Sequence, residues 1–168
     1  MRRPGVLFLT TLGWTLAFAQ TGPELAAQAE AAAKPNTHAA RQEAIELYEK
    51  AMPLLHSDPR ELAAWNRLGQ LYTQQGENKK GLSAFRAALA LARESEERKA
   101  EAFAQHGTGM AAAGLEEYAQ ATEAYTEAIR LRLELGLKFE AAVSLNNRGR
   151  PSGHPATREG RWRTCEQH

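Results

Sequence analysis

The side chains that most often do chemistry in proteins are sparse in this sequence. The chain of 168 residues has five histidines and one cysteine. His154, Cys165 and His168 are close enough in sequence to be drawn as a metal set, but ligands without a regular spacing are weak evidence for a metal site. Cys165 has no base near it in a predicted element, as a nucleophile would need. We therefore expect no metal site and no covalent catalysis.

Two further motifs have simple structural explanations. Gly107-Thr108-Gly109 is not a phosphate-binding loop, because no predicted strand precedes it and no Lys-Ser/Thr pair follows it. The acidic pairs Glu96-Glu97 and Glu116-Glu117 are expected at the starts of helices, where negative charge is stabilised by the helix dipole. The sequence therefore predicts no catalytic residue, no cofactor and no enzymatic activity.

Charge is nearly balanced, with 21 basic and 20 acidic residues. Without residues 1–3 and 148–168, the remainder has 14 basic and 18 acidic residues. A surface that binds nucleic acid needs an excess of Lys and Arg to neutralise phosphates. We therefore expect no nucleic-acid partner for the helical part.

The first 19 residues have the order of a signal peptide. Arg2 and Arg3 precede an apolar run from Val6 to Phe18, and Ala17-Phe18-Ala19 is a small-x-small cleavage site. The run is shorter than the roughly 20 residues that span a bilayer. We expect residues 1–19 to be removed, no stable membrane span after cleavage, and export to the periplasm or the outside. The alternative is an uncleaved N-terminal anchor.

The segment from Trp65 to Tyr72 carries the clearest motif of the chain. Trp65, Leu68 and Tyr72 fall at i, i+3 and i+7, on one face of a helix, and Gly69 leaves room for a second helix to approach. Gly76 then ends this helix. Phe85 and Ala88 give the following helix an inward face. The sequence therefore predicts a helical hairpin.

This pattern recurs along the chain. Gly69, Gly109 and Gly149 are spaced by 40, and Phe85 and Ala88 correspond to Tyr125 and Ala128 at the same spacing. The segment Trp65-x2-Leu68-Gly69-x2-Tyr72 resembles the first helix of a tetratricopeptide repeat. The period resembles the long-repeat bacterial branch of that family. We expect the extra residues to lengthen the second helix of each repeat.

The resemblance implies an all-α, right-handed superhelical solenoid of antiparallel helix pairs, with about three repeat units and an orphan helix. The expected domains are the signal peptide at 1–19, a degenerate helical repeat at 20–58, repeats at 59–148 and a disordered basic tail at 149–168. The residues expected to hold the repeats together are Trp65, Leu68, Gly69, Tyr72, Phe85, Ala88, Tyr125 and Ala128. Helices are expected at 23–33, 39–52, 60–75, 79–95, 97–113, 117–135 and 138–148.

Two places depart from the regular pattern. Gln105, Thr108 and Ala112 take the Trp, Leu and Tyr positions of the next unit, so we expect looser packing there. Pro53 is incompatible with a helix interior and is expected to end the helix near Met52.

The resemblance also implies the function, which is binding of a partner protein or peptide in the concave groove of a non-catalytic scaffold of the cell envelope. By analogy with the family, the groove-facing residues are Asn66, Gln70, Thr73, Gln74, Phe103, His106 and Met110. The alternative for each is a solvated surface residue. These polar side chains with one apolar patch suit an extended peptide.

Three other hypotheses arise from the end of the sequence. The chain resembles the regulatory half of larger exported proteins with a C-terminal caspase-like peptidase domain. The repeat pattern stops at Arg148 together with a change in composition, which is typical of a frameshift or truncation; the alternative is a real basic tail that binds anionic lipid or nucleic acid. Residues 138–148 also predict self-association, because Phe139, Val143 and Leu145 have no predicted second helix to cover them.

Overall fold

The chain folds into helices throughout the part that can be described. The computed structural model describes residues 20–149, and this range contains no β-strand. The elements are α1 (Gly22–Ala33), α2 (His38–Ala51), the 3-10 helix η1 (Met52–Leu54), α3 (Glu61–Gln74), α4 (Asn78–Glu94), α5 (Arg98–Gly114), α6 (Tyr118–Glu134) and α7 (Lys138–Arg148). The expected all-α fold is confirmed, and every expected helix begins and ends within one residue of the observed bounds.

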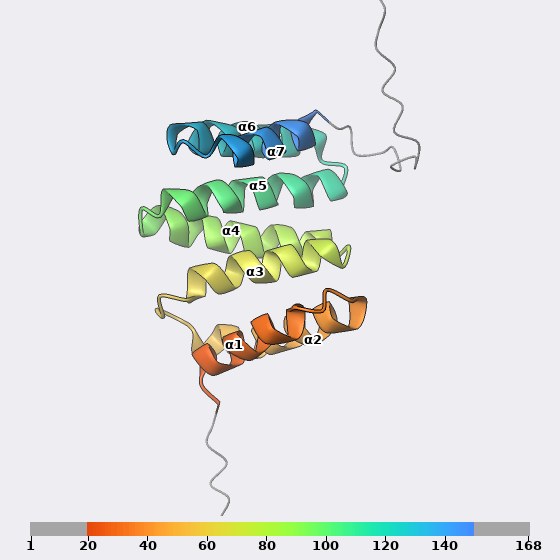
Figure 1. Ribbon diagram of the computed structural model, residues 1–168, viewed down its shortest axis with the longest axis vertical. Helices are drawn as coiled ribbons and strands as arrows, with labels where there is room; N and C mark the ends of the chain where they lie inside the picture. The colour runs from red at the N-terminus through yellow and green to blue at the C-terminus, as the bar shows by residue number, and fades with distance from the viewer. Residues whose placement is uncertain (1–19, 150–168) are drawn as a thin grey trace, which may run out of the picture.

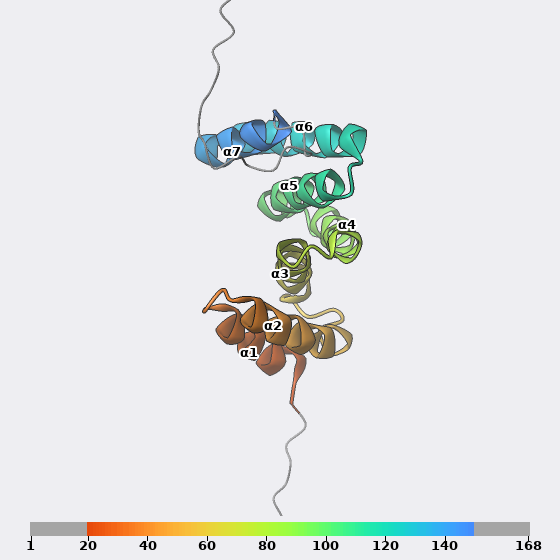
Figure 2. The same ribbon diagram turned by 90° about the vertical axis from the view of Figure 1, so that its right-hand side faces the viewer.

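The helices form pairs that stack along the long axis of the molecule (Figure 1). α1 packs on α2, α3 on α4 and α5 on α6, while α4 also packs on α5, and α6 on α7. Figure 2, turned by 90°, shows the same order of layers. The arrangement is a helical solenoid in which α7 follows the last complete pair. No helix between residues 20 and 149 combines the length and the apolar character needed to cross a bilayer.

Four turns of one geometry join the helices from α3 onward. A residue in the left-handed conformation occupies each turn, namely Gly76, Glu96, Glu116 and Gly136, with φ angles of 83°, 57°, 63° and 72°. The next N–H then bonds back into the preceding helix, as Glu77 N does to Tyr72 O at 2.9 Å. This pattern is a Schellman motif. Glu96 and Glu116 were expected inside helix starts, but they supply this turn conformation instead.

The spacing of these turns explains the long repeat. The left-handed residue recurs every 20 residues, and α5 and α6 have 17 residues each. Both helices of that repeat are therefore equally long. Our expectation that the extra length lies in the second helix was wrong for this repeat.

An aromatic ring held between glycines forms the centre of the core. Phe85 of α4 is 1% exposed. A Cβ atom at Gly69 of α3 would lie 3.0 Å from its ring, and one at Gly107 of α5 would lie 2.2 Å from its Cε1. The absence of a side chain at both positions lets α3 and α5 approach this aromatic ring closely.

The third unit packs closely, contrary to our expectation. A Cβ atom at Gly109 would lie 2.8 Å from the Tyr125 ring, and Gln105 and Thr108 are buried. Small residues on α5 therefore compensate for the missing Trp and Tyr. Of the residues predicted to hold the repeats, Leu68, Gly69, Tyr72, Phe85, Ala88, Tyr125 and Ala128 are buried and Trp65 is partly buried.

The N-terminal pair is joined to the rest by a short irregular segment. α2 ends at Ala51, and η1 begins immediately before Pro53, as the restriction on helix-interior proline predicts. Leu55 is fully buried in the core between the first two pairs. α1 lies against η1, because a Cβ atom at Gly22 would be 2.8 Å from the backbone of Leu54. The segment therefore acts as a spacer between α2 and α3.

Two predicted segments lie outside the described residues. They are the signal peptide at 1–19 and, apart from Gly149, the tail at 149–168.

Candidate functional site

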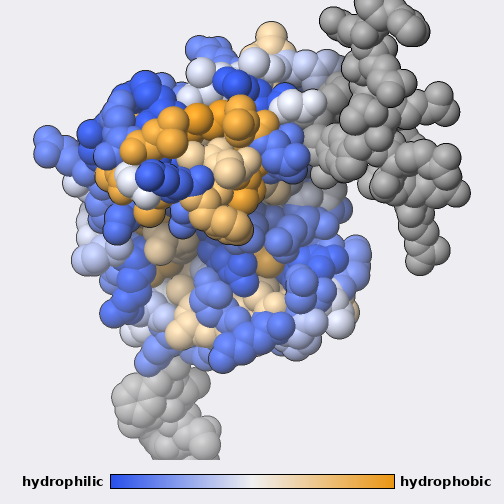
Figure 3. Space-filling model, turned by 45° about the horizontal axis from the view of Figure 1, so that its top comes forward, coloured by the Kyte–Doolittle hydropathy of each residue, from blue (hydrophilic) through white to orange (hydrophobic). Residues whose placement is uncertain are grey.

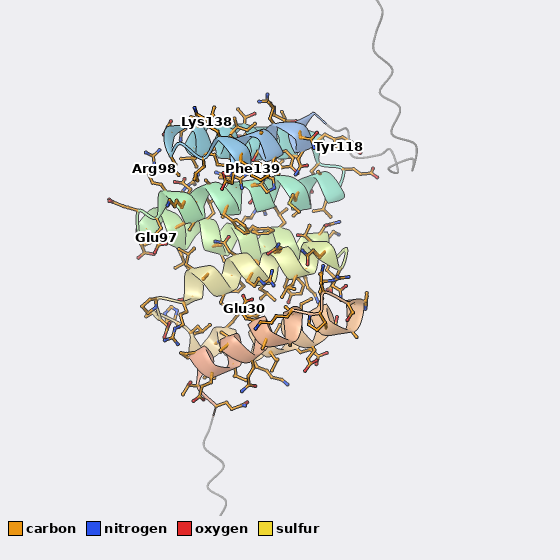
Figure 4. All side chains as sticks on the ribbon, in the orientation of Figure 1. Glu30, Glu97, Arg98, Tyr118, Lys138 and Phe139 are labelled. Atoms are coloured by element: carbon orange, nitrogen blue, oxygen red, sulfur yellow. The ribbon has the colours of Figure 1, made fainter. Side chains whose placement is uncertain are left out.

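The first helices of the three pairs border a groove with a volume of about 480 Å³. We call this the first-helix groove. Figure 4 labels two of its acidic residues, Glu30 on α1 and Glu97 just before α5. Its lining residues are Glu30, Pro59, Leu62, Ala63, Asn66, Arg67, Gln70, Glu97, Lys99, Ala100 and Phe103. The groove therefore has both an apolar and a polar wall.

Two buried polar atoms of the residues that line this groove lack a hydrogen-bond partner, Asn66 Oδ1 and Arg67 Nε. Asn66 is only 8% exposed, yet its Oδ1 atom accepts no hydrogen bond. Leaving a buried acceptor unpaired costs about 1–3 kcal/mol. Native proteins rarely keep such an atom without a reason, which makes Asn66 the residue of this groove most in need of a ligand.

The groups around Asn66 are partly engaged with one another. Arg67 Nη1 donates to Gln70 Oε1 at 2.8 Å. Arg67 Nε lies 3.3 Å from Glu30 Oε2, at ion-pair distance but without hydrogen-bond geometry. Glu30 also accepts a hydrogen bond from Tyr48 Oη at 2.5 Å. These contacts fix Arg67 and neutralise its charge locally, so the groove presents amide groups more than a free cation.

Phe103 supplies the apolar part of the site. Its side chain is 40% exposed and lies on α5, across the groove from α3. An exposed aromatic ring beside a buried, unpaired amide oxygen is an arrangement that can hold one apolar side chain and one backbone donor of a ligand.

The structure brings together three of the seven residues predicted for the groove, namely Asn66, Gln70 and Phe103. The other four do not line it. Thr73 donates to Gly69 O at 2.9 Å, Gln74 is exposed, and Met110 packs against the cluster around Tyr125. Their roles in binding stay predictions.

A larger groove lies between the second helices, where the sequence predicted no site. We call it the second-helix groove; it has a volume of about 930 Å³ and lies between α2, η1 and α4, over α3. Its lining residues are Glu49, Met52, Pro53, His56, Glu61, Trp65, Leu68, Tyr72, Lys79, Lys80, Ser83 and Ala84. The feature of the sequence that could have predicted this groove is the segment around Pro53. It interrupts the regular repeat and keeps α2 away from α4.

Several polar side chains of the second-helix groove are bonded to each other. Tyr72 Oη donates to Glu49 at 2.5 Å, and Lys80 Nζ lies 2.6 Å from Glu77 and 5.1 Å from the centre of the Tyr72 ring. Burial, followed by the hydrogen bond to Glu49, raises the pKa of the Tyr72 phenol. These satisfied groups give less reason to expect a polar ligand here than Asn66 gives in the first-helix groove.

His106, the last of the predicted groove residues, belongs to a buried polar cluster instead. Its Nδ1 atom lies 3.0 Å from Ser144 Oγ of α7, and its ring meets the Tyr125 ring edge-on at 5.5 Å. Arg132 of α6 donates to the same Ser144 hydroxyl and to Glu140 O at 2.7 Å. Because the guanidinium can only donate, Ser144 is able to donate its own proton to a neutral His106.

We expect this cluster to make the stability depend on pH. Burial, and then the charge of Arg132, lowers the pKa of His106 from 6.5 to about 4. Neutral His106 therefore stabilises the folded state. Its contribution to the free energy of unfolding is complete above pH 6.5 and is lost as the pH falls toward 4. The free energy of unfolding should fall by about 2–3 kcal/mol over this range.

Chemical denaturation at several pH values, followed by circular dichroism, measures this effect. His106→Gln should flatten the pH dependence, whereas His38→Gln, at an exposed position, should not. Equal slopes for His106→Gln and the wild type would contradict the assignment.

Among residues 20–149, no three His, Cys, Asp or Glu side chains gather in a way that could hold a metal ion. His154, Cys165 and His168 lie outside this range.

The stacked helical hairpins and the groove along their first helices define a helical-repeat protein. A comparison with protein families matches residues 60–134 to the tetratricopeptide repeat. These residues, which comprise α3 to α6, therefore form tetratricopeptide repeats. A search of curated proteins found no match. Tetratricopeptide repeats generally mediate protein–protein interaction.

Proposed function

We propose that this chain is a non-catalytic scaffold that binds an extended peptide segment of a partner protein in the first-helix groove. The observation that carries the proposal is the buried Oδ1 atom of Asn66, which has no hydrogen-bond donor. Nearly every residue of an extended peptide offers a backbone N–H. A peptide laid along the groove can therefore satisfy this acceptor without any special side chain.

The surroundings of Asn66 indicate what else the peptide contains. Phe103 favours an apolar side chain. Gln70 accepts from Arg67 through its oxygen, which leaves its amide nitrogen to donate to a peptide carbonyl. Glu30 and Glu97 offset Arg67 and Lys99 among the charges of the groove. We therefore expect a peptide without strong net charge, bound through its backbone and one apolar anchor.

We further propose that this binding takes place in the cell envelope. The support is the signal-like order of residues 1–19, in which two arginines precede an apolar run and a small-x-small site. The intact mass of the protein from an envelope fraction tests this. A species that begins at Gln20 supports export, and an unprocessed species in the cytoplasm contradicts it.

Replacing Asn66 with leucine should raise the free energy of unfolding and weaken peptide binding. The variant keeps the branched shape of the side chain at a larger volume, which the open groove can accept, and removes the unpaired acceptor, so the free energy of unfolding should rise by about 1 kcal/mol. Peptide affinity should fall about five-fold, because the hydrogen bond to the peptide is lost. A gain in stability with a loss of binding marks a residue kept for a ligand.

The probe is a set of random linear peptides displayed on phage and selected on the wild-type protein, with affinities measured by fluorescence polarisation. Phe103→Ser should also weaken the selected peptides. Ser83→Leu, an exposed position in the second-helix groove, is the matched control and should bind normally. If Asn66→Leu binds as tightly as the wild type, or if Ser83→Leu alone fails to bind, the site has been placed in the wrong groove.

A further inference from the structure

A polar groove with a volume of about 600 Å³ lies between α4 and α6. We call it the α4–α6 groove. Its floor is α5, which follows α4 and precedes α6 in the stack (Figure 2). α4 contributes Arg86 and Leu89 to its lining, and α5 contributes Gln105 and Thr108.

This groove occupies the same place in its repeat as the second-helix groove does in the preceding one. At the 40-residue spacing, Gln105 and Thr108 correspond to Trp65 and Leu68, which line the second-helix groove over α3. One place in the repeat is therefore apolar in one unit and polar in the next. A buried polar residue at such a place is more informative than a buried apolar one, because burying it without a partner is unfavourable.

The hydroxyl of Thr108 is buried and has no hydrogen bond. Thr108 is 6% exposed, and no described residue bonds its Oγ1 atom. A threonine inside a helix commonly donates to the carbonyl four residues earlier, as Thr73, Thr122 and Thr126 do in this chain. Thr108 makes no such bond, so its hydroxyl is left for a group in the groove.

Gln105 adds a buried amide to the same floor. Its side chain is 7% exposed and forms no hydrogen bond with any residue from 20 to 149. Exposed apolar side chains gather instead at the α6–α7 end of the stack (Figure 3). Because buried polar groups in native proteins nearly always have partners, Gln105 and Thr108 together indicate a polar ligand.

The two walls of the groove carry opposite charges. Arg86 and Arg93 lie on α4, whereas Glu123 and Glu127 lie on α6. The second charge of each wall is engaged elsewhere, because Arg93 and Glu127 both form ion pairs with residues that do not line the groove. Arg86 and Glu123 are therefore the charges that remain for a ligand.

Arg86 and Glu123 have no ion-pair partner among residues 20–149. With the Gln120 amide oriented so that both of its groups are used, Arg86 Nη2 donates to the neutral Gln120 oxygen at 2.8 Å, and the Gln120 nitrogen donates to Glu117 at 2.6 Å. Glu123 forms neither an ion pair nor a hydrogen bond with a described residue. The groove thus offers a free cation on one wall and a free anion on the other.

We propose that the α4–α6 groove binds a small zwitterion, either a free α-amino acid or a short unblocked peptide. Its carboxylate contacts Arg86, since arginine matches a carboxylate with two parallel hydrogen bonds, and its ammonium group contacts Glu123. Thr108 and Gln105 bond its remaining polar atoms from the floor. The volume is within the range of small-molecule sites, and the proposal does not depend on a peptide in the first-helix groove.

An NMR titration of the full chain tests the proposal. Free amino acids and unblocked dipeptides are added one at a time, at millimolar concentrations, to isotope-labelled protein. At least one of them should shift the backbone amides of Thr108 and Glu123 and the side-chain amide of Gln105. The side-chain amide of Asn66 should stay in place. Whether the amino acids or the dipeptides bind more tightly distinguishes the two sources of the zwitterion.

Thr108→Val should weaken the bound ligand about ten-fold, because one hydrogen bond to a charged group is lost. The substitution keeps the shape of the side chain and removes an unpaired buried atom, so the free energy of unfolding should not fall. Thr122→Val, at an exposed position of α6 outside the groove, is the matched control and should bind normally.

Modified ligands test the two charges separately. An amino-acid amide has no carboxylate, and an N-acetyl amino acid has no ammonium group. Arg86→Gln should weaken the unmodified ligand about ten-fold and leave the weaker binding of its amide unchanged. Glu123→Gln should behave in the same way toward the unmodified and the N-acetyl forms.

Three results would overturn the proposal. The first is that no amino acid or dipeptide binds. The second is that the shifts centre on Asn66 and Phe103, in the first-helix groove. The third is that Thr108→Val, or the two charge variants, bind the zwitterion as tightly as the wild type.

Discussion

Phe85→Ala should lower the free energy of unfolding by about 3–5 kcal/mol, the largest effect expected from a single truncation in this chain. The ring is 1% exposed and contacts both α3 at Gly69 and α5 at Gly107. Its loss leaves a cavity at the junction of two repeats, which the rigid glycine-lined helices cannot easily collapse to fill. Denaturant unfolding followed by circular dichroism measures the change.

Phe103→Ala is the matched control for this prediction. Phe103 is on the next helix but is 40% exposed, so its truncation should cost under about 1 kcal/mol. Similar losses for the two variants would mean that Phe85 is not at the centre of the core.

Gly107→Val should lower the free energy of unfolding by about 3 kcal/mol. The Cβ atom alone would lie 2.2 Å from Phe85 Cε1, far inside contact distance. The ring has little room to move away, because it is 1% exposed and also lies close to Gly69 of α3. Overpacking of this kind costs about 1–3 kcal/mol or somewhat more, and the gain in helix propensity of under about 1 kcal/mol offsets only part of it.

Two comparisons separate this clash from a general effect of valine. Gly114→Val, at the end of the same helix, first meets the flexible side chain of Asn78 and should cost much less. In a Phe85→Ala background, Gly107→Val should become nearly neutral, because the ring that it displaces is gone. A cost that adds fully to that of Phe85→Ala would show that the two positions are not coupled.

The helices could be predicted closely because their signals are local. The face formed by Trp65, Leu68 and Tyr72 and the left-handed turn at Gly76 both depend on neighbours in sequence. Pro53 likewise ended α2 as expected. The 40-residue spacing then identified Phe85 and Tyr125 as equivalent, and both are buried.

The packing of the third unit could not be predicted from its motif positions alone. Gln105 and Thr108 are poor substitutes for Trp and Leu in sequence, yet both are buried. The explanation lies in Gly107 and Gly109, whose effect depends on how closely Phe85 and Tyr125 approach from other helices. A single sequence does not show which aromatic ring will pack against a glycine inside a helix.

The candidate site was predicted only in part for the same reason. Asn66, Gln70 and Phe103 follow from the face of a first helix and do meet in one groove. His106 lies on α5 as well, but Arg132 and Ser144 from the next two helices engage it. The second-helix groove depends on how far the segment around Pro53 separates α2 from α4, which periodicity does not determine.

The measurement that tests the central claim most directly is the mapping of a bound peptide by NMR. A selected linear peptide is added to isotope-labelled protein, and the backbone and side-chain amide shifts are followed. The account predicts the largest changes at Asn66, Gln70 and Phe103, with a strong shift of the Asn66 side-chain amide. Changes centred instead on Met52, Trp65 and Lys80 would place binding in the second-helix groove and contradict the account.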